Sequence, residues 1–239
     1  MTEAFESVST WRQPEPPPLS AARTALIEEV AGRIDRLSPD RLRVAVDGFT
    51  AAGKTSFGHE LAAALRRRGR PTLRASFDDF KNPWREAREL GYDRLTGEGY
   101  YRNAYDFTSA RDLLLRPAGR DGSGQVVLCA RDPLTGEDHR GEAVTAPANA
   151  VLIVDSVFAC RPEYDEFWDY RIWLDVDPQV ALDRGIARDV AMEGLAEATK
   201  VHRDRYHAAV RIYLAEADPQ SRADVVIDNH DFARPAIRS

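Results

Sequence analysis

The residues with the clearest chemical meaning form one short segment, GFTAAGKT, at positions 48–55. This P-loop segment matches the pattern GxxxxGK[ST] at every defined position. Glycines at this spacing let backbone N–H groups surround phosphate oxygens, the lysine reaches the β- and γ-phosphates, and the hydroxyl group ligates Mg²⁺. We therefore predict a site for a nucleoside triphosphate, expected to be ATP, made by Gly48, Phe49, Thr50, Ala51, Ala52, Gly53, Lys54 and Thr55.

Three carboxylates stand where apolar segments end. Asp78 and Asp79 follow the segment 73–77, and Asp155 ends the apolar run 151–155. In open α/β sheets, ligands collect at the carboxyl ends of the strands. A carboxylate there is suited to accept the proton of an acceptor hydroxyl, and another to hold Mg²⁺ beside Thr55. We predict Asp155 for the metal; the alternative for each of these residues is a turn-capping role.

The rest of the sequence alternates between helical and strand-like patterns. Because strands alternate with helices, we expect a mainly parallel sheet between layers of helices, which is the three-layer α/β P-loop NTPase fold. Helices are expected at 20–37, 54–68, 107–115, 178–192 and 197–217, and strands at 43–47, 73–77, 125–130, 142–145, 151–155, 171–176 and 224–227.

Composition is that of an ordinary globular protein. The 239 residues are 43% hydrophobic and 30% charged, with a formal net charge of −6. An acidic chain lacks the basic surface of a dedicated nucleic-acid binder, and no apolar run is long enough to cross a bilayer. Cys129 and Cys160 have no metal-ligand spacing and are expected to be buried thiols. Without a signal-peptide pattern, we expect a cytoplasmic protein with no nucleic-acid or membrane partner; a homo-oligomer is left open.

Residues 1–19 differ from the rest of the chain. The run Pro14-Glu15-Pro16-Pro17-Pro18 predicts an irregular or polyproline leader. Residues 20–239 are then expected to form a single domain, since their number suits one α/β core.

The order of the motifs resembles the uridine kinase / phosphoribulokinase / pantothenate kinase group, and most of all its uridine-kinase-like branch. The resemblance spans about residues 42–230 and implies a helical lid at about 185–205 and a small hairpin arm on the substrate side. It rests on GFTAAGKT at 48–55, DDF at 78–80, YDF at 105–107, the strand ending at Asp155, LDRGIARD at 182–189 and ADVVI at 223–227.

The resemblance also implies roles for single residues. Asp78 corresponds to the catalytic base, Asp155 to the acidic residue near the metal, and Arg184 and Arg188 to lid arginines that contact ATP phosphates. From spacing alone, the two arginines are an i,i+4 pair on one helix face, for which a solvated face with ion pairs is the alternative.

The acceptor side departs from that family. Tyr100 stands where uridine and cytidine kinases have an acidic residue for the ribose, Arg131 stands at the position of a base-contacting tyrosine, and Glu193 and Leu195 replace lid arginines. Aromatic and cationic groups suit a flat or anionic acceptor, although the alternative is that they pack the lid against the sheet. The acceptor candidates are Asp78, Lys81, Trp84, Arg85, Tyr92, Tyr100, Tyr101 and Arg131.

These observations predict an ATP- and Mg²⁺-dependent kinase in which Lys54, Asp78 and Arg188 are catalytic. The expected acceptor is a hydroxyl of a nucleoside or nucleoside-like metabolite. One alternative is a kinase for a non-nucleoside, such as a pantothenate-like compound or a sugar phosphate. The other is a nucleotide-dependent switch or chaperone GTPase, for which an NKxD-type guanine-binding pattern is missing; DNHD at 228–231 does not match it.

Overall fold

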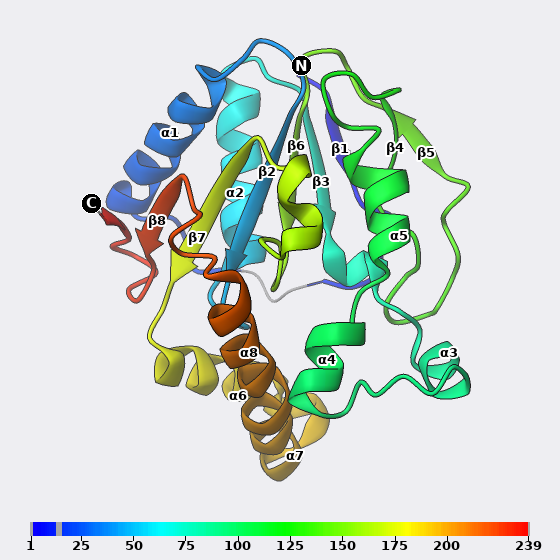
Figure 1. Cartoon of the computed structure of the whole chain (residues 1–239). Helices are drawn as coiled ribbons and strands as arrows, with labels where there is room; N and C mark the ends of the chain where they lie inside the picture. The colour runs from blue at the N-terminus through cyan, green and yellow to red at the C-terminus, as the bar shows by residue number, and fades with distance from the viewer. Residues whose placement is uncertain (1, 13–15, 239) are drawn as a thin grey trace.

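A seven-stranded sheet forms the centre of the structure (Figure 1). The computed structural model describes residues 2–12 and 16–238, without the side chains of Trp84, Arg85 and Ala87. Neighbouring strands are parallel except the last pair, β8 and β9, so the predicted mainly parallel sheet is confirmed. In spatial order the strands are β1 (Ala4–Glu6), β3 (Thr72–Ser76), β6 (Val151–Asp155), β2 (Leu42–Gly48), β7 (Tyr170–Asp175), β8 (Val225–Asp228) and β9 (Ala236–Arg238).

Helices cover both faces of the sheet and one end of it. In Figure 1, α1 and α2 lie together on one face, α5 lies on the other, and α4, α6, α7 and α8 lie beyond the carboxyl ends of the central strands. Residues 185–205, the expected lid, fall within this last group. The helices are α1 (Ala21–Asp35), α2 (Lys54–Arg67), α3 (Trp84–Glu89), α4 (Gly97–Asn103), α5 (Phe107–Ser109), α6 (Pro178–Glu193), α7 (Leu195–Lys200) and α8 (Ala208–Ala217).

The predicted helices and strands are confirmed apart from their ends and a few short elements. The expected helix at 107–115 is α5 followed by a π-helical turn, Ala110–Leu115, and the one at 197–217 contains a similar turn, Val201–His207. The helices α3 and α4 and the strands β1 and β9 were not predicted, because each has seven residues or fewer and too short a pattern to detect.

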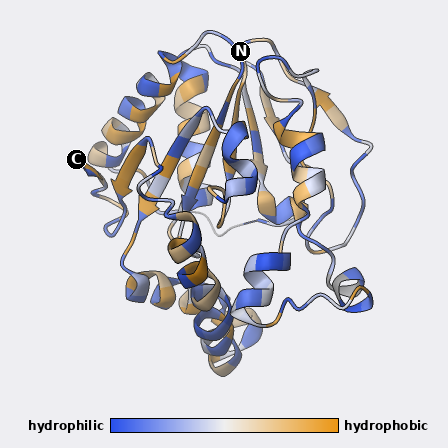
Figure 2. Ribbon diagram, viewed as in Figure 1, coloured by the Kyte–Doolittle hydropathy of each residue, from blue (hydrophilic) through white to orange (hydrophobic). Residues whose placement is uncertain are grey.

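The core has two parts because successive residues of a strand point to opposite faces. In β2, Val44 and Val46 pack with α1 and α2, whereas Ala45 belongs to the cluster on the other face. Figure 2 shows hydrophobic residues concentrated along the central strands. This explains the nearly continuous apolar runs, since each central strand is covered on both sides.

The expectation of an irregular leader is wrong for Ala4–Glu6, which form the edge strand β1 and pair with β3. Three residues at an edge carry no readable periodicity, so only the tertiary structure reveals this strand. Pro14 and Glu15 of the proline-rich run lie outside the described residues, and Pro16, Pro17 and Pro18 have no regular secondary structure.

The expected hairpin arm is present as a separate two-stranded sheet. Its strands, β4 (Gln125–Val127) and β5 (Ala143–Thr145), are antiparallel. Both cysteines are buried free thiols, as predicted. Among the described helices, none is both long and apolar enough to cross a membrane.

Candidate active site

The P-loop joins β2 to α2, which is the arrangement predicted for the GFTAAGKT segment. A Cβ atom at Gly48 would lie 2.6 Å from the carbonyl oxygen of Leu174 in β7, so a larger residue cannot fit there. Gly53 has a φ of 91° and caps the start of α2, a conformation that glycine adopts without strain. The helix therefore begins with its free N–H groups and positive dipole end at the loop, where an anion is stabilised.

Lys54 is enclosed by the loop that it belongs to. Its Nζ donates a hydrogen bond to the carbonyl oxygen of Phe49 at 2.7 Å, and only 8% of the residue is exposed. Burial lowers the pKa of Lys54 to about 8, against the opposing effect of the carboxylates of Asp47, Asp155 and Asp78. A buried cation among acidic groups at a helix start is suited to neutralise phosphate charge.

Thr55, at the start of α2, and Asp155, at the end of β6, bring two side-chain oxygen groups into contact. The Thr55 hydroxyl donates to Asp155 Oδ2 at 2.7 Å, and Arg74 donates to Asp155 Oδ1 at 2.5 Å. Mg²⁺ in phosphoryl-transfer sites takes one or two carboxylates together with phosphate oxygens and water. Thr55 and Asp155 line, together with Asp78, a cavity of about 330 Å³, so both the donor set and the space fit a hydrated Mg²⁺.

The adjacent carboxylates of Asp78 and Asp79 have different surroundings. They lie in a short 3₁₀ helix, Phe77–Phe80, that continues β3. Asp78 is half-buried and pairs with Lys81 at 2.8 Å. Burial would raise the pKa of Asp78, but the charge and hydrogen bond of Lys81 hold it below the ordinary value, so Asp78 is ionised and able to accept a proton.

Asp79 points away from solvent and is 3% exposed. Burial raises its pKa to about 6, although the hydroxyl of Ser7 donates to Asp79 Oδ2 at 2.6 Å and opposes the shift. Both carboxylates line the cavity. The side chain of Asp78 is 32% exposed, however, whereas Asp79 is almost fully buried and is held by Ser7. The geometry therefore favours Asp78 over Asp79 as the base.

Arg188 lies on α6 and forms two hydrogen bonds with Asp189, at 2.6 and 2.9 Å. Burial would lower the pKa of Arg188, but Asp189 raises it, and the charge of Asp78 acts in the same direction. Asp189 also contacts the fully buried His202 at 2.7 Å, which fixes the carboxylate. The charge of Arg188 on α6 lowers the pKa values of both Lys54 and Asp78.

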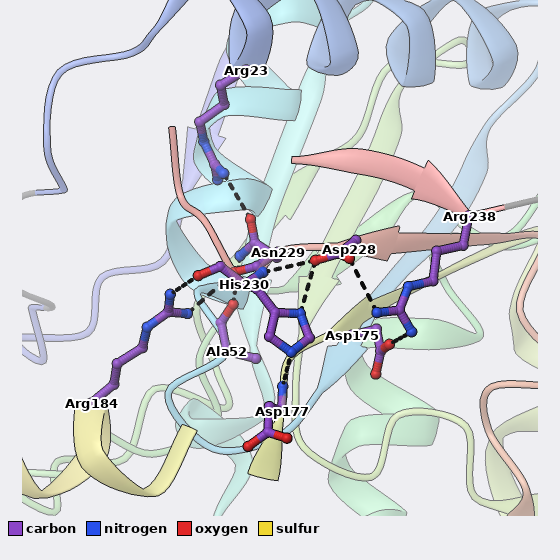
Figure 3. Close-up of polar contacts among 9 residues, drawn as sticks. All are labelled: Arg23, Ala52, Asp175, Asp177, Arg184, Asp228, Asn229, His230 and Arg238. Atoms are coloured by element: carbon purple, nitrogen blue, oxygen red, sulfur yellow. Dashed lines mark hydrogen bonds and ion pairs between the residues drawn. The ribbon is translucent and has the colours of Figure 1, made fainter. Parts of the chain in front are cut away.

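Arg184 lies on α6 and contacts the segment near the C-terminus. Its guanidinium donates to the carbonyl oxygens of Asn229 and His230, at 3.3 and 2.5 Å, in the loop that follows β8 (Figure 3). The contact ties the lid helix to this loop. Contact between Arg184 and ATP phosphates stays a prediction.

Asn229 connects that loop to the P-loop and to α1. Its side-chain amide donates to the carbonyl oxygen of Ala52 at 2.7 Å, and its side-chain oxygen accepts from Arg23 at 2.9 Å (Figure 3). Arg23 is fully buried, pairs with Glu60 of α2 at 2.8 Å and stacks on Phe232. The shape of the P-loop thus depends on a side chain from near the C-terminus.

The acceptor candidates fall into three groups. Lys81 and Tyr100 lie near Asp78, because Lys81 pairs with it and Tyr100 affects the pKa of Lys81. Arg131 lies on the hairpin arm and donates to the carbonyl oxygen of Gly136 at 3.2 Å. Tyr101 is 1% exposed and packs on Phe158 and Tyr213, so its contacts support the packing interpretation.

For the remaining acceptor candidates, the structure gives no contact, among the described residues, with those around Asp78. Tyr92 is 48% exposed. The side chains of Trp84 and Arg85 lie outside the described part of the structure.

Sequence reasoning missed four side chains at this site: Ser7, Arg74, Tyr206 and Asn229. Arg74 had a detectable signal, a charged residue inside an apolar strand, which indicates a buried partner. Tyr206 packs on Tyr100 with ring centroids 5.1 Å apart and belongs to the lid side. Ser7 and Asn229 carry no local signal, because each contacts a residue more than 70 positions away.

No protein-family model and no curated protein matches this chain. Solved structures do resemble it. A candidate uridine kinase from Bacillus stearothermophilus is 22% identical with a TM-score of 0.60, over 86% of this chain and 97% of that one. A candidate fructose transport system kinase from Silicibacter sp. TM1040 is 22% identical with a TM-score of 0.64, over 81% of this chain and 94% of that one.

A third solved structure extends the comparison. D-glycerate 3-kinase from Cryptococcus neoformans var. grubii is 12% identical with a TM-score of 0.53, over 90% of this chain and 99% of that one. At these identities the comparison establishes architecture, which agrees with the strand order and the P-loop described above. The chain therefore has the P-loop kinase fold of the uridine-kinase-like type.

Proposed function

We propose that this protein is an ATP- and Mg²⁺-dependent kinase that phosphorylates a hydroxyl group of a small molecule. The observation that carries the proposal is the convergence of Lys54, Thr55, Asp155 and Asp78 at the carboxyl ends of the adjacent strands β2, β6 and β3. Positioning and charge neutralisation are the main demands of phosphoryl transfer. Each of the three structural neighbours is named as a kinase, which supports the same reaction class.

In the proposed reaction, P-loop amides and Lys54 bind the ATP phosphates. Asp78 accepts the proton of the acceptor hydroxyl as its oxygen forms a bond to the γ-phosphorus, and the bond from that phosphorus to the β–γ bridging oxygen breaks, so ADP leaves. Arg188 stabilises the charge on the transferred group from the lid side. Thr55 and Asp155 would hold Mg²⁺, which would supply further charge neutralisation at the phosphates.

The proposed acceptor is a nucleoside or nucleoside-like metabolite, with a non-nucleoside alcohol as the alternative. The retained P-loop, base and lid support a small-molecule kinase, whereas Tyr100 and Arg131 do not match the residues with which uridine kinases hold their substrate. The GTPase alternative has no supporting feature, because no guanine-binding pattern is found in the sequence.

An ATP-consumption screen over nucleosides, vitamins and sugars tests the proposal, with ADP release as the readout. We expect release that depends on one class of added alcohol and on Mg²⁺. Lys54→Ala is the control, since it removes the phosphate-binding cation, and it should lower turnover by at least about 10²–10³-fold. Because Lys54 is buried, the unfolding temperature of this variant is measured alongside its turnover. The proposal would be contradicted if the rate of ADP release did not change with any added alcohol, or if it were the same in Lys54→Ala as in the wild type.

A further inference from the structure

The N-terminal segment reaches the carboxyl end of the strand that carries the proposed base. In β1, Ala4, Phe5 and Glu6 pair in parallel with Thr72, Leu73 and Arg74 of β3. Figure 1 shows β1 next to β3 at the edge of the sheet. Because the two strands run in the same direction, the residues that follow β1 lie beside the turn that follows β3. We name residues 7–12 the N-terminal strap.

The first strap residue holds Asp79. The Ser7 hydroxyl donates to Asp79 Oδ2 at 2.6 Å, while the main-chain carbonyl of Asp79 accepts from the N–H groups of Ala130 and Arg131, at 3.0 and 3.1 Å. Asp79 is therefore fixed at both ends, its side chain by the strap and its main chain by the hairpin arm. Its neighbour Asp78 shares this backbone, so the position of the proposed base depends on both contacts.

The strap is also tied to the arm directly. The N–H of Thr10 donates to Asp132 Oδ2 at 2.5 Å, and the other oxygen of Asp132 accepts from Leu134 and Thr135 at 2.8 Å each. The strap, the turn after β3 and the arm thus form a closed set of contacts around Asp79. A closed set resists displacement more than any single hydrogen bond does.

The end of the strap forms a wall of the cavity at the catalytic site. Trp11 and Arg12 line the same cavity of about 330 Å³ as Thr55, Asp78 and Asp155. Arg12 donates only to main-chain carbonyls within the strap, those of Ser9 and Trp11, among the described residues. The strap therefore covers the proposed metal side of the site as well as supporting the base.

We infer that the N-terminal strap is a working part of the active site, in which Ser7 is a positioning residue that holds the Asp78–Asp79 turn in its productive place. The inference rests on the proposed kinase function, because it assigns Asp78 a role in the reaction. It extends that function to a segment whose sequence contains no motif. Ser7 acts through its hydrogen bond to Asp79.

Amide hydrogen exchange on the full-length chain tests the positioning without any substrate. The variants are Ser7→Ala, Ser7→Thr, which retains a hydroxyl, and Val8→Ala as the matched control, because Val8 is 53% exposed and lies in the same segment. In Ser7→Ala we expect exchange in peptides covering 76–81 and 129–132 to become about fivefold faster, as for the loss of one buried hydrogen bond. Ser7→Thr and Val8→Ala should exchange like the wild type.

Kinetics then connects position to reaction, with the acceptor that the screen identifies. In Ser7→Ala, kcat should fall between about 10- and 100-fold, as for a misplaced catalytic group, while KM for ATP stays within about twofold. Ser7→Thr should recover most of kcat. A general structural defect would instead raise KM for ATP and lower the unfolding temperature.

The outcomes separate this inference from the proposed function. Unchanged exchange in Ser7→Ala, or an equal change in Val8→Ala, overturns the positioning role, whatever the protein phosphorylates. Faster exchange together with unchanged kcat overturns the link to catalysis. Faster exchange in a protein that consumes ATP with no alcohol supports the contact and overturns the kinase proposal alone.

Discussion

The proposed nucleotide side and the proposed acceptor side of this site are built in opposite ways. The nucleotide side is a contiguous loop of eight residues between a strand and a helix, and it presents mostly backbone N–H groups. The acceptor side combines the turn after β3, α4, the lid, the hairpin arm and the N-terminal strap. A phosphate is bound by a repeatable backbone shape, whereas an acceptor is selected by side chains from separate segments, which can change independently.

The difference between the two sides predicts poor activity with pyrimidine nucleosides. By the resemblance to uridine and cytidine kinases, Tyr100 and Arg131 stand where those enzymes bind ribose and base. A site without matching hydrogen-bonding groups discriminates by roughly 10⁴–10⁵-fold. We expect kcat/KM for uridine and cytidine far below the common enzyme range of about 10⁴ M⁻¹s⁻¹ and above. A kcat/KM inside that range would mean that the acceptor side binds pyrimidine nucleosides as uridine kinases do, and that only the residues used differ.

A smaller but still large loss of kcat is expected from Asp78→Asn. The amide keeps the shape of the side chain but cannot accept the hydroxyl proton, so kcat should fall about 10²–10⁴-fold while ATP affinity is kept. Asp79→Asn is the matched control, since its amide oxygen can still accept from Ser7. Full kcat in Asp78→Asn together with loss in Asp79→Asn would reverse the assignment of the two carboxylates.

Asn229→Ala tests whether the P-loop keeps its ATP-binding shape without a contact from outside the loop. The change removes the donor to the carbonyl of Ala52, so we expect ATP to bind about tenfold more weakly, measured by calorimetry. Asn82→Ala is the control, because its amide also donates to main-chain carbonyls, those of Asn103 and Tyr105, but away from the P-loop. Equal ATP affinity in both variants would mean that the loop holds its shape alone.

The last expected effect concerns the pH dependence of stability and not the reaction itself. Asp79 has a pKa of about 6, above its ordinary value of 3.8, because burial disfavours its charge. The native state therefore binds the proton more tightly, and the stability that this adds is complete below about pH 4 and is lost as pH rises through about 6. A shift of this size corresponds to about 3 kcal/mol at most.

Urea unfolding at several pH values measures this effect. From pH 4 to pH 7 the free energy of unfolding of Asp79→Asn should improve relative to that of the wild type, because the amide does not ionise. Asp183→Asn, at an exposed position on α6, should follow the wild type. Parallel curves for Asp79→Asn and wild type would indicate that Asp79 is ionised without cost in the folded protein.

The sequence alone determined the features that depend on neighbouring residues. The P-loop could be recognised because its function needs glycines, a lysine and a threonine at set positions in one loop. The choice of Asp78 over Asp79 rested on the resemblance to the uridine-kinase-like group. The long strands and helices followed from apolar periodicity, and the pair Asp78–Asp79 and Asp155 stood out by their places at strand ends. In each case a local pattern is enough, since backbone geometry over a few residues decides the outcome.

Only the tertiary structure decided which distant side chains support these features. Arg74 pairs with Asp155 across 81 positions, Ser7 with Asp79 across 72, and Asn229 with Ala52 across 177. No periodicity encodes such pairs, because they depend on strand order and on how the chain termini return to the sheet. Single serine, asparagine and arginine residues have many ordinary surface roles, so their participation in the site follows from packing and burial rather than from their identity.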